Sequence, residues 1–116
     1  MPYDEKLADR IRIALRPRRG LSERKMFGGL AFLLRGHMLC GVVGADLMVR
    51  VGAAAYEESL ARPHAREMDF SGRPMKGLVY VAPPGVRTSR QLGSWLERGL
   101  AFVSALPPKQ GGDTRA

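Results

Sequence analysis

The sequence predicts a single α+β domain, in which an antiparallel sheet of about five strands is flanked by helices. Apolar segments at residues 30–34, 38–43 and 47–51 follow one another after very short connections. Such connections join antiparallel strands, because a parallel crossover needs about a dozen residues or more. Helical spacing of apolar residues occurs at both ends of the chain and once between the strands. Hairpins combined with separate helices are typical of the α+β class.

Residues 24–34 are the stretch around which the chain is organised. After two basic residues, a Met-Phe pair and two glycines, five apolar residues occupy both odd and even positions. A strand with this pattern is covered on both faces. We therefore expect the central strand of the sheet here, with a bend or bulge at Gly28 and Gly29. The apolar run is too short to span a membrane.

A helix is expected before this strand. Asp4 is a suitable N-cap, and Leu7, Ile11 and Leu15 recur at intervals of four on one helical face. Pro17 ends the helix. A tight hairpin loop at residues 35–37, a strand at 38–43, a turn at 44–46 and a third strand at 47–51 follow the central segment.

The second half of the chain predicts a helix, two strands and a helix. The helix covers residues 53–62 and the strands residues 65–70 and 75–82, which completes the order α-β-β-β-α-β-β-α. Ser89 is expected to cap the last helix, with Thr88 as the competing choice. Gly93 and Gly99 lie inside this helix, where close packing on the sheet would explain them. Residues 1–108 then form one domain, and residues 109–116 a disordered tail.

Composition leaves two interpretations of the charge open. The net charge of +8 suits a nucleic-acid partner, but it also follows from general use of arginine. Cys40 is the single cysteine, which agrees with a reducing compartment. The N-terminus lacks the basic and apolar regions of a signal peptide, so we expect a soluble cytoplasmic protein.

No complete catalytic, phosphate-binding or metal-binding motif is found in the sequence. Cys40 lies in an apolar strand and is expected to be a buried, unreactive thiol. His37 and Cys40 are three residues apart, which places them on opposite faces of a regular strand and argues against a metal site. We therefore expect no catalytic residue, no cofactor and no metal. An enzyme or small-ligand protein with a pocket between sheet and helices is the third-ranked alternative.

Two clusters combine charge, methionine, phenylalanine and glycine in a way that suits an adaptable protein-binding surface. The residues expected to form this surface are Arg24, Lys25, Met26, Phe27, Gly28, Gly29, Asp69, Phe70, Arg73, Met75 and Lys76. The structural alternative is that the glycines only shape strands and that Asp69 pairs with Arg73. For nucleic-acid binding, backbone contacts would come from a row of Arg12, Arg16 and Arg19.

The same clusters carry a family resemblance. Lys25 to Gly29 and residues 68–77, together with residues 47–51 and the helix that contains Trp95, resemble the N-terminal domain family of the TfoX/Sxy competence regulators. The resemblance covers about residues 3 to 108. It implies an antiparallel α+β domain similar to secretion chaperones, and a non-enzymatic role. The regulators carry a second, helical domain that has no counterpart in these 116 residues. The chain therefore resembles a stand-alone N-terminal domain.

The resemblance also implies the kind of partner. Competence regulators of this type act with the cyclic-AMP receptor protein at promoters, so the expected partners are proteins connected with the transcription machinery. Weak contact with DNA and a homodimer are further expectations, the latter because exposed sheet edges of small domains often pair. No membrane partner is expected.

Overall fold

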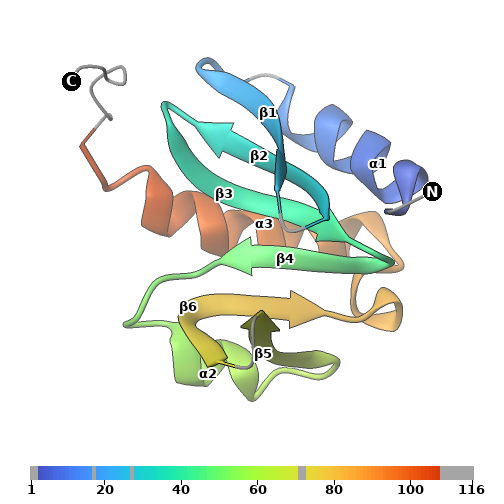
Figure 1. Cartoon of the computed structure of the whole chain (residues 1–116), viewed down its shortest axis with the longest axis vertical. Helices are drawn as coiled ribbons and strands as arrows, with labels where there is room; N and C mark the ends of the chain where they lie inside the picture. Colours follow the sequence, from blue (N-terminus) through green and yellow to red (C-terminus); the bar gives the residue numbers. More distant parts are fainter. Residues whose placement is uncertain (1–2, 17, 27, 71–72, 108–116) are drawn as a thin grey trace.

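Helices and an antiparallel sheet form a single layered unit in the computed structural model of the chain (Figure 1). The structure describes residues 3–16, 18–26, 28–70 and 73–107, with only the backbone at residues 70, 73 and 74. The predicted tail at 109–116 lies outside these residues. The elements are, in order, α1 (Glu5–Leu15), β1 (Leu21–Met26), β2 (Gly29–Leu34), β3 (His37–Val43), β4 (Asp46–Arg50), α2 (Tyr56–Leu60), β5 (Ala65–Phe70), β6 (Arg73–Val81), a 3-10 turn (Pro83–Val86) and α3 (Ser89–Val103).

The predicted α+β class with an antiparallel sheet is confirmed. Within the described residues the sheet has six strands in the order β1-β2-β3-β4-β6-β5, and every neighbouring pair is antiparallel. Every residue of β2 is buried, as its apolar run predicts. The strand is second from the edge of the sheet, however, so the expectation of a central position was wrong.

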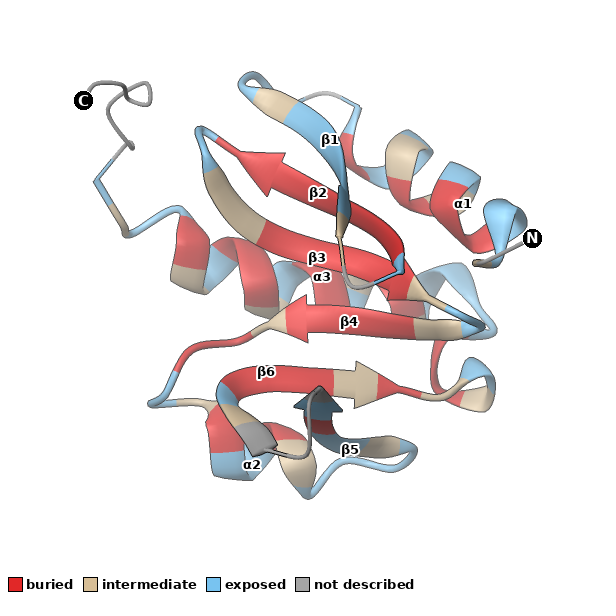
Figure 2. Ribbon diagram, in the orientation of Figure 1, coloured by how far each residue is buried: buried red, intermediate tan, exposed pale blue. Residues whose placement is uncertain are grey.

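The segment 24–34 is not one strand with a bend, as the sequence suggested, but part of a hairpin. Strand β1 runs back along β2, with Leu21 opposite Leu34 and Met26 opposite Gly29. The reversal occurs at Gly28, whose φ of 75° lies in the left-handed region that glycine adopts without strain. Strand β1 is mostly exposed (Figure 2), because it forms the edge of the sheet.

A β-bulge in β3 changes which side chains share a face. Cys40 is opposite Phe32 and Met38 opposite Leu33, so Leu39 is the extra residue. His37 pairs with Leu34 and therefore lies on the same face as Cys40, contrary to the sequence-based expectation. The His37 Nε2 atom contacts the carbonyl oxygen of Pro107 at 2.6 Å. No group of three or more potential metal ligands occurs in the part of the chain that the structure describes.

Helices α1 and α3 pack on one face of the sheet and form the main core with it (Figure 1). Thr88, the competing choice in the sequence, is the N-cap of α3, and Ser89 is its first residue. The Thr88 hydroxyl accepts a hydrogen bond from the Gln91 N–H at 3.0 Å, and the Gln91 side chain accepts one from the Thr88 N–H at 2.9 Å. This reciprocal pair is a capping box, which a serine at position 89 cannot form with Gln91. None of the helices in the described residues is long and apolar enough to cross a bilayer.

Candidate functional site

The face of the sheet opposite α1 and α3 carries a second apolar cluster that is rich in methionine. Its buried members are Ala31, Leu33, Met48, Met68 and Leu78, and the half-buried residues that pack against them are Met26, Met38, Val43, Met75 and Tyr80. These ten residues are called the methionine face below. All methionines in the described residues belong to it.

Strand alternation explains how the methionine face forms. In β4, Leu47 and Val49 contribute to the helix-covered core, whereas Met48 between them belongs to the methionine face. In β6, Val79 and Val81 contribute to the core, and Leu78 to the methionine face. Neighbouring residues of a strand point to opposite faces, so both faces of these strands are apolar and buried.

A hollow of about 450 Å³ opens at one end of the methionine face. Met38, Met75 and Leu78 from that face contribute to its lining, together with Phe102 of α3. Methionine is flexible and polarisable, so its side chains adapt to partners of different shape. The hollow therefore offers an apolar pocket that can accommodate an anchor side chain.

Basic side chains stand beside this hollow. The Arg50 guanidinium donates a hydrogen bond to the Met38 carbonyl at 3.4 Å and lies 5.2 Å from the centre of the Phe102 ring. These contacts hold the cation at the wall of the hollow, since a guanidinium over an aromatic ring is attracted by it. Lys76 also lines the hollow and is exposed. The arrangement combines an apolar pocket with positive charge.

The first predicted cluster, residues 24–29, contributes side chains to both faces of the sheet. Arg24 is opposite Ala31 and therefore lies on the side of the methionine face, where Met26 also packs. Lys25 is opposite Leu30 and points to the other side. Both basic residues are exposed, Gly28 is exposed and Gly29 is buried. Phe27 lies outside the described residues.

Part of the second predicted cluster, residues 69–76, lies on the same face as Met26. Met75 packs on the methionine face and Lys76 lines its hollow, whereas Asp69 is exposed at the sheet edge. The side chains of Phe70 and Arg73 lie outside the described part of the structure. The structure thus brings Met26 and Met75 to one cluster, although their strands are not neighbours in the sheet.

Sequence reasoning missed Met38, Met48, Arg50 and Phe102. Met38 was assigned to a strand without a face, because the bulge at Leu39 decides that face. For Met48, its alternation with Leu47 and Val49 in β4 is the signal that could have indicated the face. Arg50 and Phe102 meet only through the tertiary fold.

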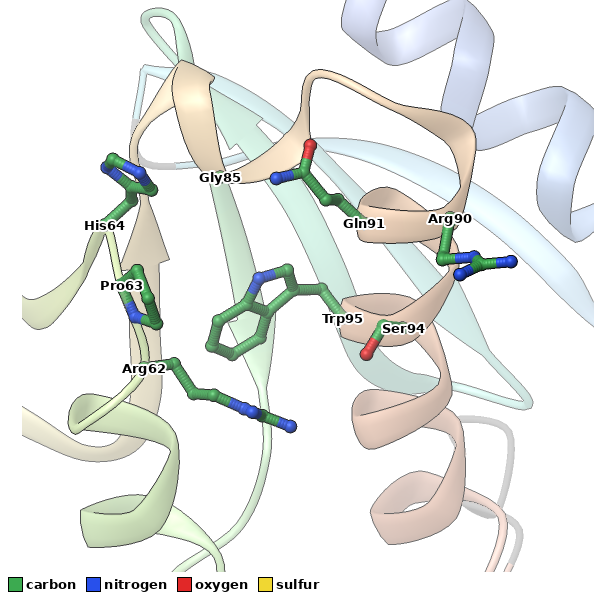
Figure 3. Close-up of a pocket in the computed structure, with 8 residues that line it drawn as sticks. All are labelled: Arg62, Pro63, His64, Gly85, Arg90, Gln91, Ser94 and Trp95. Carbon is green, nitrogen blue, oxygen red and sulfur yellow. The ribbon is translucent and has the colours of Figure 1, made fainter.

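A second hollow, of about 280 Å³, lies between α2 and α3 (Figure 3). Its walls carry Arg62, His64 and Arg90, and Trp95 lies between them. None of these four residues belongs to the methionine face or was selected from the sequence as a site residue. The two hollows are therefore separate features of the molecule.

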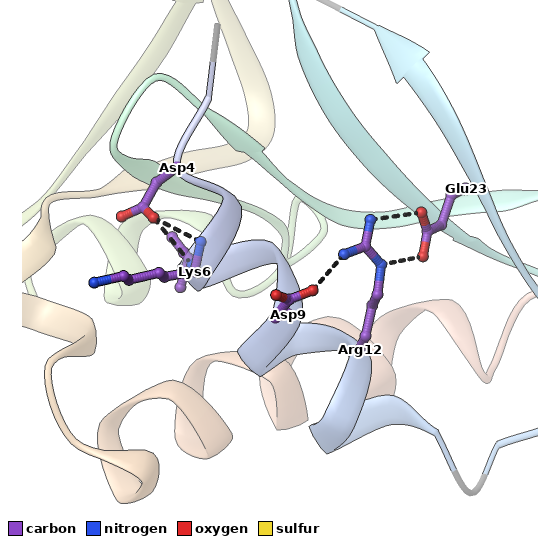
Figure 4. A network of polar contacts seen from close by, with 6 residues as sticks. Asp4, Lys6, Asp9, Arg12 and Glu23 are labelled. Atoms are coloured by element: carbon purple, nitrogen blue, oxygen red, sulfur yellow. Dashed lines mark hydrogen bonds and ion pairs between the residues drawn. The ribbon is translucent and has the colours of Figure 1, made fainter. Parts of the chain in front are cut away.

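The arginine row proposed for nucleic-acid contact begins with a side chain that is already bound to acids (Figure 4). The Arg12 guanidinium donates hydrogen bonds to Asp9 at 2.6 Å and to Glu23 at 2.7 and 3.0 Å. The Glu23 bond is the main cause that raises the pKa of Arg12. Arg16 and Arg19 are exposed. At the start of the same helix, Asp4 accepts hydrogen bonds from two backbone N–H groups, which confirms it as the N-cap.

Cys40 is the buried thiol that the sequence predicted. It is completely inaccessible to solvent, and burial raises the pKa of its thiol. A thiolate, not a thiol, is the reactive nucleophile, so this group is unsuited to covalent chemistry in the folded protein. Its contribution is to the packing of the helix-covered core.

Comparison with protein families identifies the chain. No curated protein and no solved structure matches it. The family described as the TfoX N-terminal domain matches residues 14–103, a range that extends from the end of α1 to the last residue of α3. The match covers more than half of the chain and contains every strand of the sheet. The chain therefore belongs to the TfoX N-terminal domain family.

Proposed function

We propose that this protein is a non-enzymatic, cytoplasmic interaction module whose methionine face binds a segment of a partner protein. The observation that carries the proposal is the gathering of methionines from both edges and the centre of the sheet on one face, where Met38 and Met75 line a hollow with cationic walls. The five half-buried apolar side chains of this face lie together around its buried members, and a contiguous apolar patch of this kind favours a protein partner. Cores of protein interfaces are enriched in methionine, aromatic residues and arginine.

Charge complementarity specifies the chemistry of the partner. Arg50 and Lys76 line the hollow, and Arg24 lies on the same side of the sheet. No acidic residue from the described part of the chain lines the hollow. The proposed partner segment therefore carries an apolar anchor side chain with acidic residues on either side of it. The acidic residues would steer association and the anchor would occupy the hollow.

The family resemblance supports a place for this interaction in transcription. Competence regulators of this family act at promoters, so a subunit or regulator of the transcription machinery is the proposed source of the acidic segment. Direct binding to DNA is not needed for this role. The engagement of Arg12 with Asp9 and Glu23 also reduces the number of guanidinium groups that face solvent along α1.

The proposal is tested with a fluorescent peptide in which leucine and phenylalanine alternate with aspartate and glutamate. Anisotropy is measured for the wild-type protein, for Lys76→Glu and for Lys6→Glu as the matched control, since Lys6 is an exposed lysine on α1. We expect saturable binding that Lys76→Glu weakens by about fivefold, equivalent to about 1 kcal/mol. Lys6→Glu should bind as the wild type does.

Three controls identify other occupants. A peptide with lysine in place of the acidic residues should not bind, and a labelled DNA duplex should bind more weakly than the acidic peptide at both low and moderate salt. Tighter binding of the duplex than of the acidic peptide would indicate that the partner is a nucleic acid and not a protein. Light scattering of the protein alone tests whether it forms a homodimer. If it does, and if Lys76→Glu dissociates the dimer, the occupant of the methionine face is a second copy of the chain. Equal binding by both lysine variants would refute the assignment of the site.

A further inference from the structure

The hollow between α2 and α3 has the composition of an anion-binding site. Arg62, Pro63 and His64 come from the segment that connects α2 to β5, and Arg90 and Ser94 from the first turns of α3. Figure 3 shows the two sets on opposite sides of the Trp95 ring. Among the described residues, the charged side chains that line this hollow are arginines, and the lining includes neither aspartate nor glutamate.

Within the described residues, the two arginines of this hollow have no acidic partner, whereas four other arginines, Arg12, Arg18, Arg66 and Arg98, have one. Arg98, which lies 5.4 Å from the centre of the Trp95 ring, is paired with Glu58 at 3.4 Å. In contrast, none of the ion pairs or side-chain hydrogen bonds found among the described residues involves Arg62 or Arg90. The hollow therefore has positive charge that the protein itself does not neutralise there.

Part of the wall of the hollow is fixed by the fold. Gln91 is held on both sides, because its amide nitrogen donates to the Pro84 carbonyl at 3.2 Å and its oxygen accepts from the Thr88 N–H. Trp95 is only 6% exposed, and its ring lies beside Pro63 in Figure 3. His64 has a φ of 69°, a conformation that persists in a non-glycine residue only when its surroundings enforce it. The part of the wall formed by Gln91 and Trp95 is thus preformed, whereas Arg62 and Arg90 are exposed side chains.

We propose that this hollow binds a small ligand that carries a phosphate or carboxylate group next to a flat apolar part. Guanidinium groups recognise both anions through paired N–H donors, and Arg62 and Arg90 would supply these from the two sides. The flat part would lie against Pro63 and the small part of Trp95 that lines the hollow, where its apolar surface is removed from water. The volume of about 280 Å³ suits a single-ring compound. This site shares no residue with the methionine face and does not depend on the proposed function.

Trp95 makes the site directly measurable, because it is the only tryptophan of the chain. The full-length protein is titrated with phenyl phosphate, benzoate, inorganic phosphate and benzyl alcohol, and tryptophan fluorescence is recorded. We expect a saturable change with phenyl phosphate or benzoate, weaker binding of inorganic phosphate, and no saturation with benzyl alcohol. The tighter of the first two identifies phosphate or carboxylate as the preferred group.

Variants then locate the binding. Arg62→Gln and Arg90→Gln should each raise the dissociation constant of the tighter ligand about fivefold or more, whereas Arg19→Gln, an exposed arginine outside the hollow, should leave it unchanged. Circular dichroism confirms that the variants are folded. Absence of saturation with both aromatic anions, or equal affinities in all three variants, would overturn the proposal. Equal affinities for inorganic phosphate and phenyl phosphate would overturn the contact with Trp95.

Discussion

Alanine substitution at Gly93 and at Gly99 should change the stability of the protein in opposite directions. Both glycines lie inside α3, where alanine is favoured over glycine by about 1 kcal/mol. A Cβ atom at position 93 would meet no atom within 4 Å. Gly93→Ala should therefore gain the full helix propensity and raise the free energy of unfolding by about 1 kcal/mol.

At position 99 the same Cβ atom would enter the contact between α3 and the sheet. It would lie 3.0 Å from Leu39 Cδ1 and 3.3 Å from both the Leu39 carbonyl oxygen and Val49 Cγ1. Leu39 and Val49 are completely buried, and the carbonyl oxygen belongs to the backbone of β3, so the neighbours have little room to retreat. Overpacking of this kind costs about 1–3 kcal/mol. After the propensity gain of about 1 kcal/mol, Gly99→Ala should lose about 0–2 kcal/mol.

Urea unfolding followed by Trp95 fluorescence and by circular dichroism measures both variants. With a slope of about 2 kcal/mol per M, the midpoint should rise by about 0.5 M for Gly93→Ala and fall by up to about 1 M for Gly99→Ala. Agreement of the two probes excludes a local effect of position 93 on the nearby tryptophan. If Gly99→Ala raised the midpoint as much as Gly93→Ala, close approach of the helix to the sheet would not be the reason for glycine there.

Three further predictions concern single side chains. Thr88→Ala should lower the free energy of unfolding by about 1 kcal/mol because the capping box is lost, whereas Ser89→Ala should change it little; urea unfolding measures both. Tyr56→Phe should raise the melting temperature, because the buried Tyr56 hydroxyl has no hydrogen-bond partner in the described structure and such a group costs about 1–3 kcal/mol. Burial raises the pKa of the Cys40 thiol in the folded state, so its stabilising contribution is complete below the unfolded pKa of about 8.5 and is lost as the pH rises above it. Wild type should consequently lose stability faster than Cys40→Val in urea titrations at increasing alkaline pH.

Local patterns were sufficient to predict most of the elements. The spacing of Leu7, Ile11 and Leu15 located α1, and all three are buried. Asp4 accepts the hydrogen bonds expected of an N-cap, since that role depends only on residues within the same turn. The turn at Arg35 and Gly36 also follows from local sequence: both have positive φ, as a two-residue hairpin loop requires.

Features that depend on distant contacts could not be predicted. The position of β6 between β4 and β5 pairs Leu47 with Val81, residues that are far apart in the sequence. The bulge at Leu39 is a property of the pairing between β2 and β3. It reversed the expected orientation of His37 relative to Cys40. The face on which each methionine lies also depends on the pairing register of the strands. The candidate site was therefore only partly predicted.

The continuity of one sheet face explains how one surface can include both sequence clusters. In a flat sheet, β1 and β5 would be separated by five strand spacings of about 4.8 Å, or about 24 Å, which methionine side chains do not bridge. Nevertheless, Met26 of β1 and Met68 of β5 belong to the same apolar cluster. The two methionines are linked across the sheet by cluster members from the strands between them, among them Ala31 of β2, Met48 of β4 and Leu78 of β6. One continuous apolar face thus extends from one edge strand to the other. A slip of register by one residue in any of these strands would turn its side chains to the opposite face, and would thus disturb the proposed binding face even if it replaced none of its side chains.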